Sequence, residues 1–310
     1  MGSAVEILER LCAKNPDDPD LRAELGTAFR HLADIRRQGV GNNEESEAYS
    51  RRALTIHQAL TTRYPTRGAY SLNLAWDSLG LGATLILARK YEEAETLESR
   101  AATIMEGLAN EYPGVPGFRQ TETDVLGHRA IAFLMTGNRR GAEKMIGQLQ
   151  SGNDEGRTAA NLAFIAWHLV HHGAPPVAEP AYAVELSRRS LALRPESVGA
   201  WHAMGMARYR AGQWDEAIKA LTKANELEHH KGLDSNGFFL AMAHHKKGDA
   251  KQARSWYDRS VSWVAEHKVT DPNAERYRNE AAGLLGVEPP ETKANPKKAP
   301  DRRAVQDRPD

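Results

Sequence analysis

Apolar side chains recur every three or four residues along most of the chain, and no useful length alternates apolar and polar residues. That spacing lines one face of an α-helix, whereas a half-buried strand needs the alternation. We therefore expect an all-α fold with no sheet. In the first half the pattern predicts helices near residues 20–38, 44–63, 69–88, 91–110, 118–136 and 140–150.

The second half of the chain carries one helical pattern twice. WHAMGMARYRAGQWDEAIKALTKANEL is followed by GFFLAMAHHKKGDAKQARSWYDRSVSW, and Gly212 and Ala217 recur 36 residues later as Gly248 and Ala253. One unit earlier, Ala183 precedes Ala217 by 34 residues. A period near 34 with small residues at fixed places is typical of stacked helix–turn–helix repeats. Small side chains at such places let neighbouring helices approach closely.

The first half has a longer period. Tyr64-Pro65 recurs as Tyr112-Pro113 and Ala53 as Ala101, each 48 residues later. A residue before proline avoids the α conformation, so these dipeptides end helices. The longer unit adds about three turns to each helix pair at 1.5 Å per residue. We therefore expect longer helices in the first half than in the second.

These periods predict a tetratricopeptide-type α-solenoid, a right-handed superhelix of antiparallel helix pairs, over residues 1–286. Five or six pairs fit that length, closed by a cap helix at residues 273–285 (NAERYRNEAAGLL). Residues 287–310 hold five prolines and no aromatic residue, so we expect them to be disordered. At the other end, Ala4 to Lys14 resembles the second helix of a pair whose first helix is missing. Either the chain is part of a longer polypeptide or it starts with a degenerate cap.

The residues from about Val184 to Gly286 resemble a tetratricopeptide region of planctomycete bacteria that often follows a Pkn-type serine/threonine kinase domain. The strings AVELSRRSLALRP, GMARYRAGQWDEAIKAL and AERYRNEAAGLLG carry the resemblance, and EAYSRRALTIHQAL is similar to the preceding repeats of such proteins. The resemblance implies the repeat fold and a kinase partner, in cis or in trans. It does not imply kinase activity, because this chain lacks the catalytic domain.

Charge and composition narrow the partners. Lys and Arg number 41 and Asp and Glu also 41, so the chain lacks the basic excess that nucleic-acid binding needs. Cys12 is the single cysteine, which excludes an intrachain disulfide. The longest nearly apolar run, Leu79 to Ala88, is about half of a membrane span. We expect a cytoplasmic protein with no membrane insertion and no nucleic-acid partner.

No catalytic motif is present. The chain has no H-R-D or D-F-G kinase motif and no phosphate-binding P-loop, and Gly80-Leu81-Gly82 is interpreted as close helix packing. His168 and His172 lie one helical turn apart, the best pair for a metal-dependent enzyme, but no third ligand can be named nearby. They are more simply surface groups near a helix C-terminus. We therefore expect no catalytic residue, no cofactor and no metal site.

Partner binding in such repeats usually uses the concave face, which the first helix of each pair forms. Counting from the glycines places six residues there: His202, Met206, Tyr209, Phe238, Met242 and His245. The alternative is that some of them only pack against the next helix. The function expected from these residues is a non-catalytic scaffold that binds a hydrophobic peptide or helix. The second hypothesis is the regulatory, C-terminal region of a serine/threonine kinase.

Overall fold

The computed structural model describes residues 2–38, 43–112, 114–171, 179–228, 235–267, 269 and 272–289. These residues form fourteen α-helices and no strand. The helices are α1 (Gly2–Lys14), α2 (Pro19–Gln38), α3 (Asn43–Arg63), α4 (Gly68–Leu87), α5 (Tyr91–Glu111), α6 (Pro116–Met135), α7 (Arg139–Ser151), α8 (Glu155–His171), α9 (Pro180–Leu193), α10 (Val198–Arg210), α11 (Trp214–Leu227), α12 (Asn236–Lys246), α13 (Ala250–Glu266) and α14 (Pro272–Leu285).

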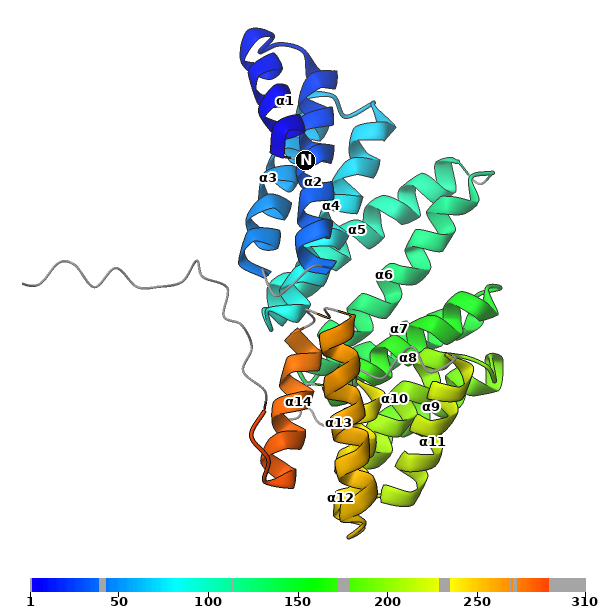
Figure 1. Ribbon diagram of the computed structural model, residues 1–310. Coiled ribbons are helices and arrows are strands. Elements are labelled where there is room, and N and C mark those ends of the chain that lie inside the picture. Colours follow the sequence, from blue (N-terminus) through cyan, green and yellow to red (C-terminus); the bar gives the residue numbers. More distant parts are fainter. Residues whose placement is uncertain are drawn as a thin grey trace, which may run out of the picture.

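The helices form a solenoid of six pairs, α2/α3 to α12/α13, with α1 before the first pair and α14 after the last (Figure 1). Most helices pack on their neighbours in sequence, and the first helices of successive pairs also touch one another. Contacts of this nearest-neighbour kind define a repeat architecture. The predicted all-α solenoid is therefore confirmed.

The six helices predicted for the first half are present, and each end lies within two residues of its predicted place. From α2 to α6 the helices are 20 or 21 residues long. From α7 to α14 they range from 11 to 17 residues. The longer period of the first half thus becomes longer helices. Of the predicted disordered tail, residues 290–310 lie outside the described residues.

Glycines shape the turns inside three of the pairs. Gly137, Gly212 and Gly248 each come two residues after the last residue of α6, α10 and α12, and their φ angles are 81°, 76° and 81°. Residues with a Cβ rarely adopt this left-handed conformation, which is common where a helix ends. In two of these turns the following helix starts with a side-chain cap, since Asn138 accepts a hydrogen bond from Gly141 N and Asp249 from Gln252 N.

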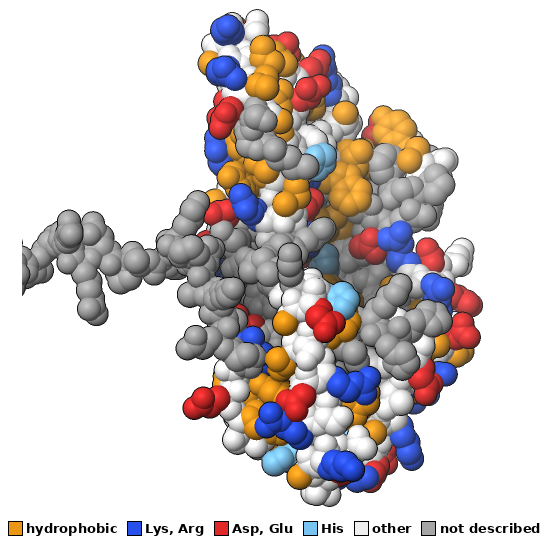
Figure 2. Space-filling model, in the orientation of Figure 1, with side chains coloured by type: hydrophobic (Ala, Val, Ile, Leu, Met, Phe, Trp, Pro, Cys, Tyr) orange, Lys and Arg blue, Asp and Glu red, His pale blue; other side chains and the backbone are white. Residues whose placement is uncertain are grey.

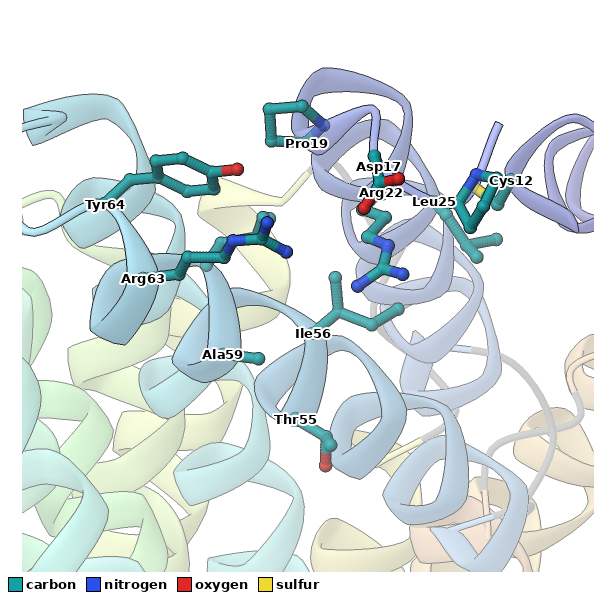
Figure 3. Close-up of a pocket in the computed structure, with 12 residues that line it drawn as sticks. Cys12, Asp17, Pro19, Arg22, Leu25, Thr55, Ile56, Ala59, Arg63 and Tyr64 are labelled. Carbon is teal, nitrogen blue, oxygen red and sulfur yellow. The ribbon is translucent and has the colours of Figure 1, made fainter. Parts of the chain in front are cut away.

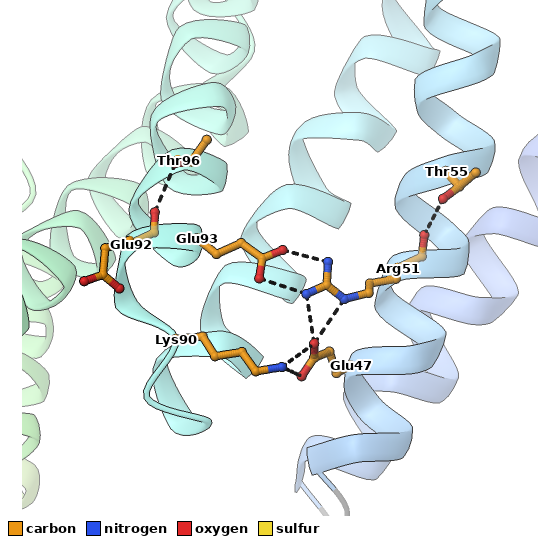
Figure 4. Close-up of polar contacts among 7 residues, drawn as sticks. All are labelled: Glu47, Arg51, Thr55, Lys90, Glu92, Glu93 and Thr96. Carbon is orange, nitrogen blue, oxygen red and sulfur yellow. Dashed lines mark hydrogen bonds and ion pairs between the residues drawn. The ribbon is translucent and has the colours of Figure 1, made fainter.

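A network of ion pairs joins successive repeats along α3 and α5 (Figure 4). Arg51 binds both oxygens of Glu93, with distances of 2.7 and 2.9 Å, and also binds Glu47 on its own helix. Lys90, just before α5, donates to the same Glu47 at 2.8 Å. The hydrogen bond from Arg51 lowers the pKa of Glu93. Partners 42 or 43 residues apart meet here because α3 and α5 are equivalent helices of consecutive units.

Gly205 lets α10 and α11 approach closely. A Cβ at this position would lie 2.5 Å from Leu221 Cγ, closer than such atoms can pack, and 3.2 Å from Leu221 N, which is also a tight contact. Leu221 has no exposed surface, so its side chain has no free space to move into. A residue without a Cβ is therefore a steric requirement at this crossing.

We expect Gly205→Ala to destabilise the chain by about 1–3 kcal/mol, because the added methyl overpacks the crossing. The matched control is Gly80→Ala in α4, where the new methyl meets nothing within 4 Å. There the better helix propensity of alanine should raise stability by up to about 1 kcal/mol. Urea unfolding of both variants measures the difference. Equal effects at the two sites would contradict the close approach at Gly205.

Candidate interaction surface

The structure buries four of the six residues predicted to form a binding face. Met206, Phe238 and Met242 have no exposed surface, and Tyr209 is 6% exposed. His202 and His245 are half-buried. A side chain without exposed surface cannot contact a partner unless the helices separate. Four of the predicted residues are therefore core residues in this structure: Met206, Tyr209, Phe238 and Met242. This agrees with the alternative interpretation, that some of the six residues only pack against the next helix.

The last helices of the chain cover this part of the inner face. Tyr209 packs against the Phe239 ring of α12, with the ring centres 5.4 Å apart, and Phe239 packs against Tyr277 of α14 at 4.9 Å. Phe238 points instead toward Tyr257 of α13, 5.9 Å away. Rings from α10, α12, α13 and α14 thus fill the space that was predicted to hold a partner.

Two polar contacts hold α14 in place. Arg210 of α10 forms an ion pair with both oxygens of Glu280, at 2.8 Å for the longer contact. Arg276 Nη2 donates to the backbone oxygen of His171, the last residue of α8, at 2.5 Å. These contacts bridge 70 and 105 residues of sequence. The C-terminal helix therefore closes the inner face over α10 and α12.

An accessible part of the inner face remains between α8 and α10. A cavity of about 370 Å³ opens there, and we call it the α8–α10 pocket. Its lining residues come from one face of α8 and from the start of α10: Ala160, Ala163, Phe164, Trp167, Ser197, Gly199 and His202. Phe164 is 38% exposed, an unusually large fraction for a phenylalanine beside a packed core.

Ring contacts fix the aromatic wall of the α8–α10 pocket. Phe164 lies parallel to Trp167, with the ring centres 6.3 Å apart, and also contacts His128 of α6 at 5.6 Å. Trp167 stacks on His171 at 3.8 Å. Such pairs add to the stability of a cluster beyond the area they bury. The exposed ring of Phe164 is therefore held by its contacts with His128 and Trp167.

His202 supplies a polar group to the same pocket. Burial lowers the pKa of its imidazole to about 4, so the ring is neutral at pH 7. Its Nε2 atom is shielded from solvent and has no hydrogen-bond partner within the described part of the chain. A neutral imidazole nitrogen can donate or accept one hydrogen bond, depending on the tautomer. His202 is the one predicted face residue that lines this pocket.

Of the two histidines considered for metal binding, the structure describes only His168, and this residue is buried. His168 is 2% exposed and packs edge-on against Phe164 and Trp167, so its predicted place as a surface group was wrong. His172 lies outside the described residues. Among the residues with described positions, no group of three histidine, cysteine or carboxylate side chains could hold a metal ion. Likewise, none of the described helices combines the length and hydropathy needed to cross a bilayer.

Comparison with known proteins identifies the class of one repeat. A tetratricopeptide repeat family matches residues 198–230, which include the α10/α11 pair. That pair is therefore a tetratricopeptide repeat, and it lies within a longer helical solenoid. No curated protein sequence matches the chain.

Several solved structures are similar to this chain. A thermophilic tetratricopeptide repeat protein of Thermus thermophilus is 18% identical, with a TM-score of 0.46 over 69% of this chain and all of its own. Yeast Tom70 is 13% identical, with a TM-score of 0.48 over 92% of this chain and 59% of its own. The human IFIT1 dimer with m7Gppp-AAAA is also 13% identical, with a TM-score of 0.45 over 92% of this chain and 65% of its own.

Proposed function

We propose that the protein is a non-catalytic, cytoplasmic scaffold that binds an apolar peptide or helix of a partner protein in the α8–α10 pocket. The observation that carries the proposal is the exposed Phe164 ring, held by its neighbours beside a cavity of about 370 Å³. Exposed aromatic side chains in rigid hollows are typical anchors of protein interfaces.

The size and chemistry of the pocket limit what it binds. Its volume is near the lower end for ligand pockets, so it suits one or two apolar side chains rather than a large cofactor. Phe164 and Trp167 offer apolar surface, and the shielded Nε2 of His202 offers one hydrogen bond. A backbone amide of a bound peptide would satisfy that nitrogen. This set favours an apolar anchor residue with its peptide group over a charged ligand.

We expect Phe164→Asp to lower the affinity for such a partner peptide about 30-fold or more, which is the effect of losing a hot-spot residue. The probe is a peptide selected from a display library on the intact chain, and its affinity is measured by fluorescence anisotropy. Trp76→Asp is the matched control, because Trp76 is similarly exposed at 40% but lies on α4, outside the pocket. Loss of affinity in both variants, or in neither, would remove the α8–α10 pocket as the binding site.

The kinase context remains a proposal that rests on the sequence resemblance of residues 184–286. In that setting the solenoid is the regulatory region of a serine/threonine kinase, or binds such a kinase in trans. A kinase-coding region fused or adjacent to the gene would support this context. The kinase context would be excluded if no kinase gene lies next to this gene and no kinase is found among the partners whose binding depends on Phe164.

A further inference from the structure

A second cavity lies at the opposite end of the solenoid, in the groove between α1 and α3. It encloses about 330 Å³ over the first half of α2 (Figure 3), and we call it the α1–α3 groove. Both helices pack on α2, and a surface ion pair between Glu9 and Arg52 joins them at 2.6 Å. The space between α1 and α3 stays open because both helices pack against α2 and make few contacts with each other.

The floor of the α1–α3 groove is apolar and its rim is charged. Leu25, Ile56 and Leu60 lie among its lining residues. Arg22 comes from α2 and Arg63 from the end of α3, and in Figure 3 both guanidinium groups point into the space between these helices.

The two arginines differ from their neighbours in having no carboxylate partner among the described residues. Six of the seven arginines between residues 30 and 67 form ion pairs, and Arg63 is the exception. Arg63 lies 5.6 Å from the ring of Tyr64, which leaves its N–H groups available. Arg22 also forms no ion pair within the part of the chain that the structure describes. Two unpaired guanidinium groups therefore face one apolar hollow.

The residues that line the groove can be compared with the equivalent residues of the next repeat, which shows which of them the packing of the repeats needs. Helices α4 and α5 start 49 and 48 residues after α2 and α3. At those steps the floor is kept, and the equivalents of Leu25, Ile56 and Leu60 are Leu74, Ile104 and Leu108.

The two cations are not kept in that comparison. Arg22 corresponds to Ser71 and Arg63 to Glu111, which carries the opposite charge. The repeat thus needs the apolar floor but not the arginines, so the arginines call for another explanation.

The net charge of the rim indicates a monoanion. Asp17 also lines the groove, so two positive charges and one negative charge leave a net charge of +1. Burial raises the pKa of the Cys12 thiol, which therefore adds no charge at pH 7. A planar guanidinium pairs best with a carboxylate through two parallel hydrogen bonds. A phosphate dianion would exceed the charge of this rim and lie close to Asp17.

We propose that the α1–α3 groove binds the carboxyl terminus of a peptide that ends in an aliphatic residue. The terminal carboxylate lies between Arg22 and Arg63, and the last side chain lies on Leu25 and Ile56. This site is on the outer side of the first pairs and is independent of the α8–α10 pocket.

The test compares probes by NMR titration of the intact chain. The acetylated peptide Gly-Ser-Gly-Leu with a free carboxylate is expected to bind, and its amide is expected to bind about 10- to 100-fold more weakly, as the loss of a charge-assisted contact requires. Arg22→Gln and Arg63→Gln should each lower the affinity for the peptide with the free carboxylate by a similar factor. Arg63→Lys should give an intermediate loss, because it keeps the charge but not the fork.

The controls make each outcome decisive. Arg188→Gln, on the distant α9, should bind the acid like the wild type, and so should Phe164→Asp. Arg22 and Arg63 are exposed, so unchanged unfolding midpoints are expected for their glutamine variants. The proposal is overturned if the amide binds as well as the acid, if both glutamine variants bind normally, or if no probe binds. Tighter binding of inorganic phosphate or of octanoate than of the peptide would also overturn it.

Discussion

Phe238→Asp is expected to unfold the C-terminal pairs of the solenoid, with a loss of about 5 kcal/mol or more. Phe238 has no exposed surface and packs against Tyr257. Removing a buried phenylalanine costs about 3–5 kcal/mol, and an unpaired buried carboxylate adds several more. Because helices pack mainly on their neighbours in the solenoid, the damage should spread from α12 to α13 and α14 before it reaches the first pairs.

Hydrogen exchange measured by mass spectrometry locates this unfolding, and urea titration gives its size. Phe164→Asp is the matched control, because it makes the same change at an exposed ring and should leave exchange in α12 to α14 as in the wild type. A folded Phe238→Asp variant that has lost only partner binding would show that Phe238 faces solvent. That result is what counting from the glycines predicted, and it would contradict the packing described above.

Asp77→Ala is expected to lower stability by about 3–5 kcal/mol, because it leaves the Arg30 guanidinium and the buried His57 ring without their acceptor. The Asp77 side chain is fully buried. It accepts from Arg30 Nη1 at 3.2 Å and lies 2.5 Å from His57 Nδ1. The other ring nitrogen of His57 lies 3.1 Å from the backbone oxygen of Ala23. One carboxylate thus joins α2, α3 and α4.

The local exchange pattern distinguishes this role from a general loss of stability. In Asp77→Ala, exchange should rise in α2, α3 and α4 and stay low in α10 and α11. Asp77→Asn should be milder, since an amide oxygen still accepts a hydrogen bond. Asp258→Ala removes a surface carboxylate that pairs with Arg254 on the same helix, so it should change little. A small effect in Asp77→Ala would mean that the three helices are held without this network.

Local sequence signals accounted for the helices but not for their exposed faces. Proline after Tyr64 and glycine at positions 212 and 248 act within one turn, so helix ends could be predicted from neighbouring residues. The contact of His57 with Asp77 joins residues 20 apart on different helices, and no sequence motif predicts this contact. Its geometry depends on Gly26, where a Cβ would lie 2.6 Å from the His57 ring.

The candidate binding face shows the same limit. The run GFFLAMA in α12 is apolar on every side, which is the signal of a buried helix and argued against an exposed Phe238. The run LAFIAW in α8 is equally apolar, yet Phe164 is exposed because α8 and α10 leave a hollow beside it. Whether α14 covers one hollow and not the other depends on contacts across 70 residues or more. Hydrophobic side chains are also visible at the surface of the N-terminal part in Figure 2.

The most direct test of the central claim is the hydrogen-exchange footprint of a display-selected peptide on the intact chain. If the peptide binds in the α8–α10 pocket, new protection is expected in α8 and the first turns of α10, with the outer helices α9 and α11 unchanged. Protection confined to α9 and α11, or spread evenly along the solenoid, would contradict the assignment of the α8–α10 pocket as the partner site.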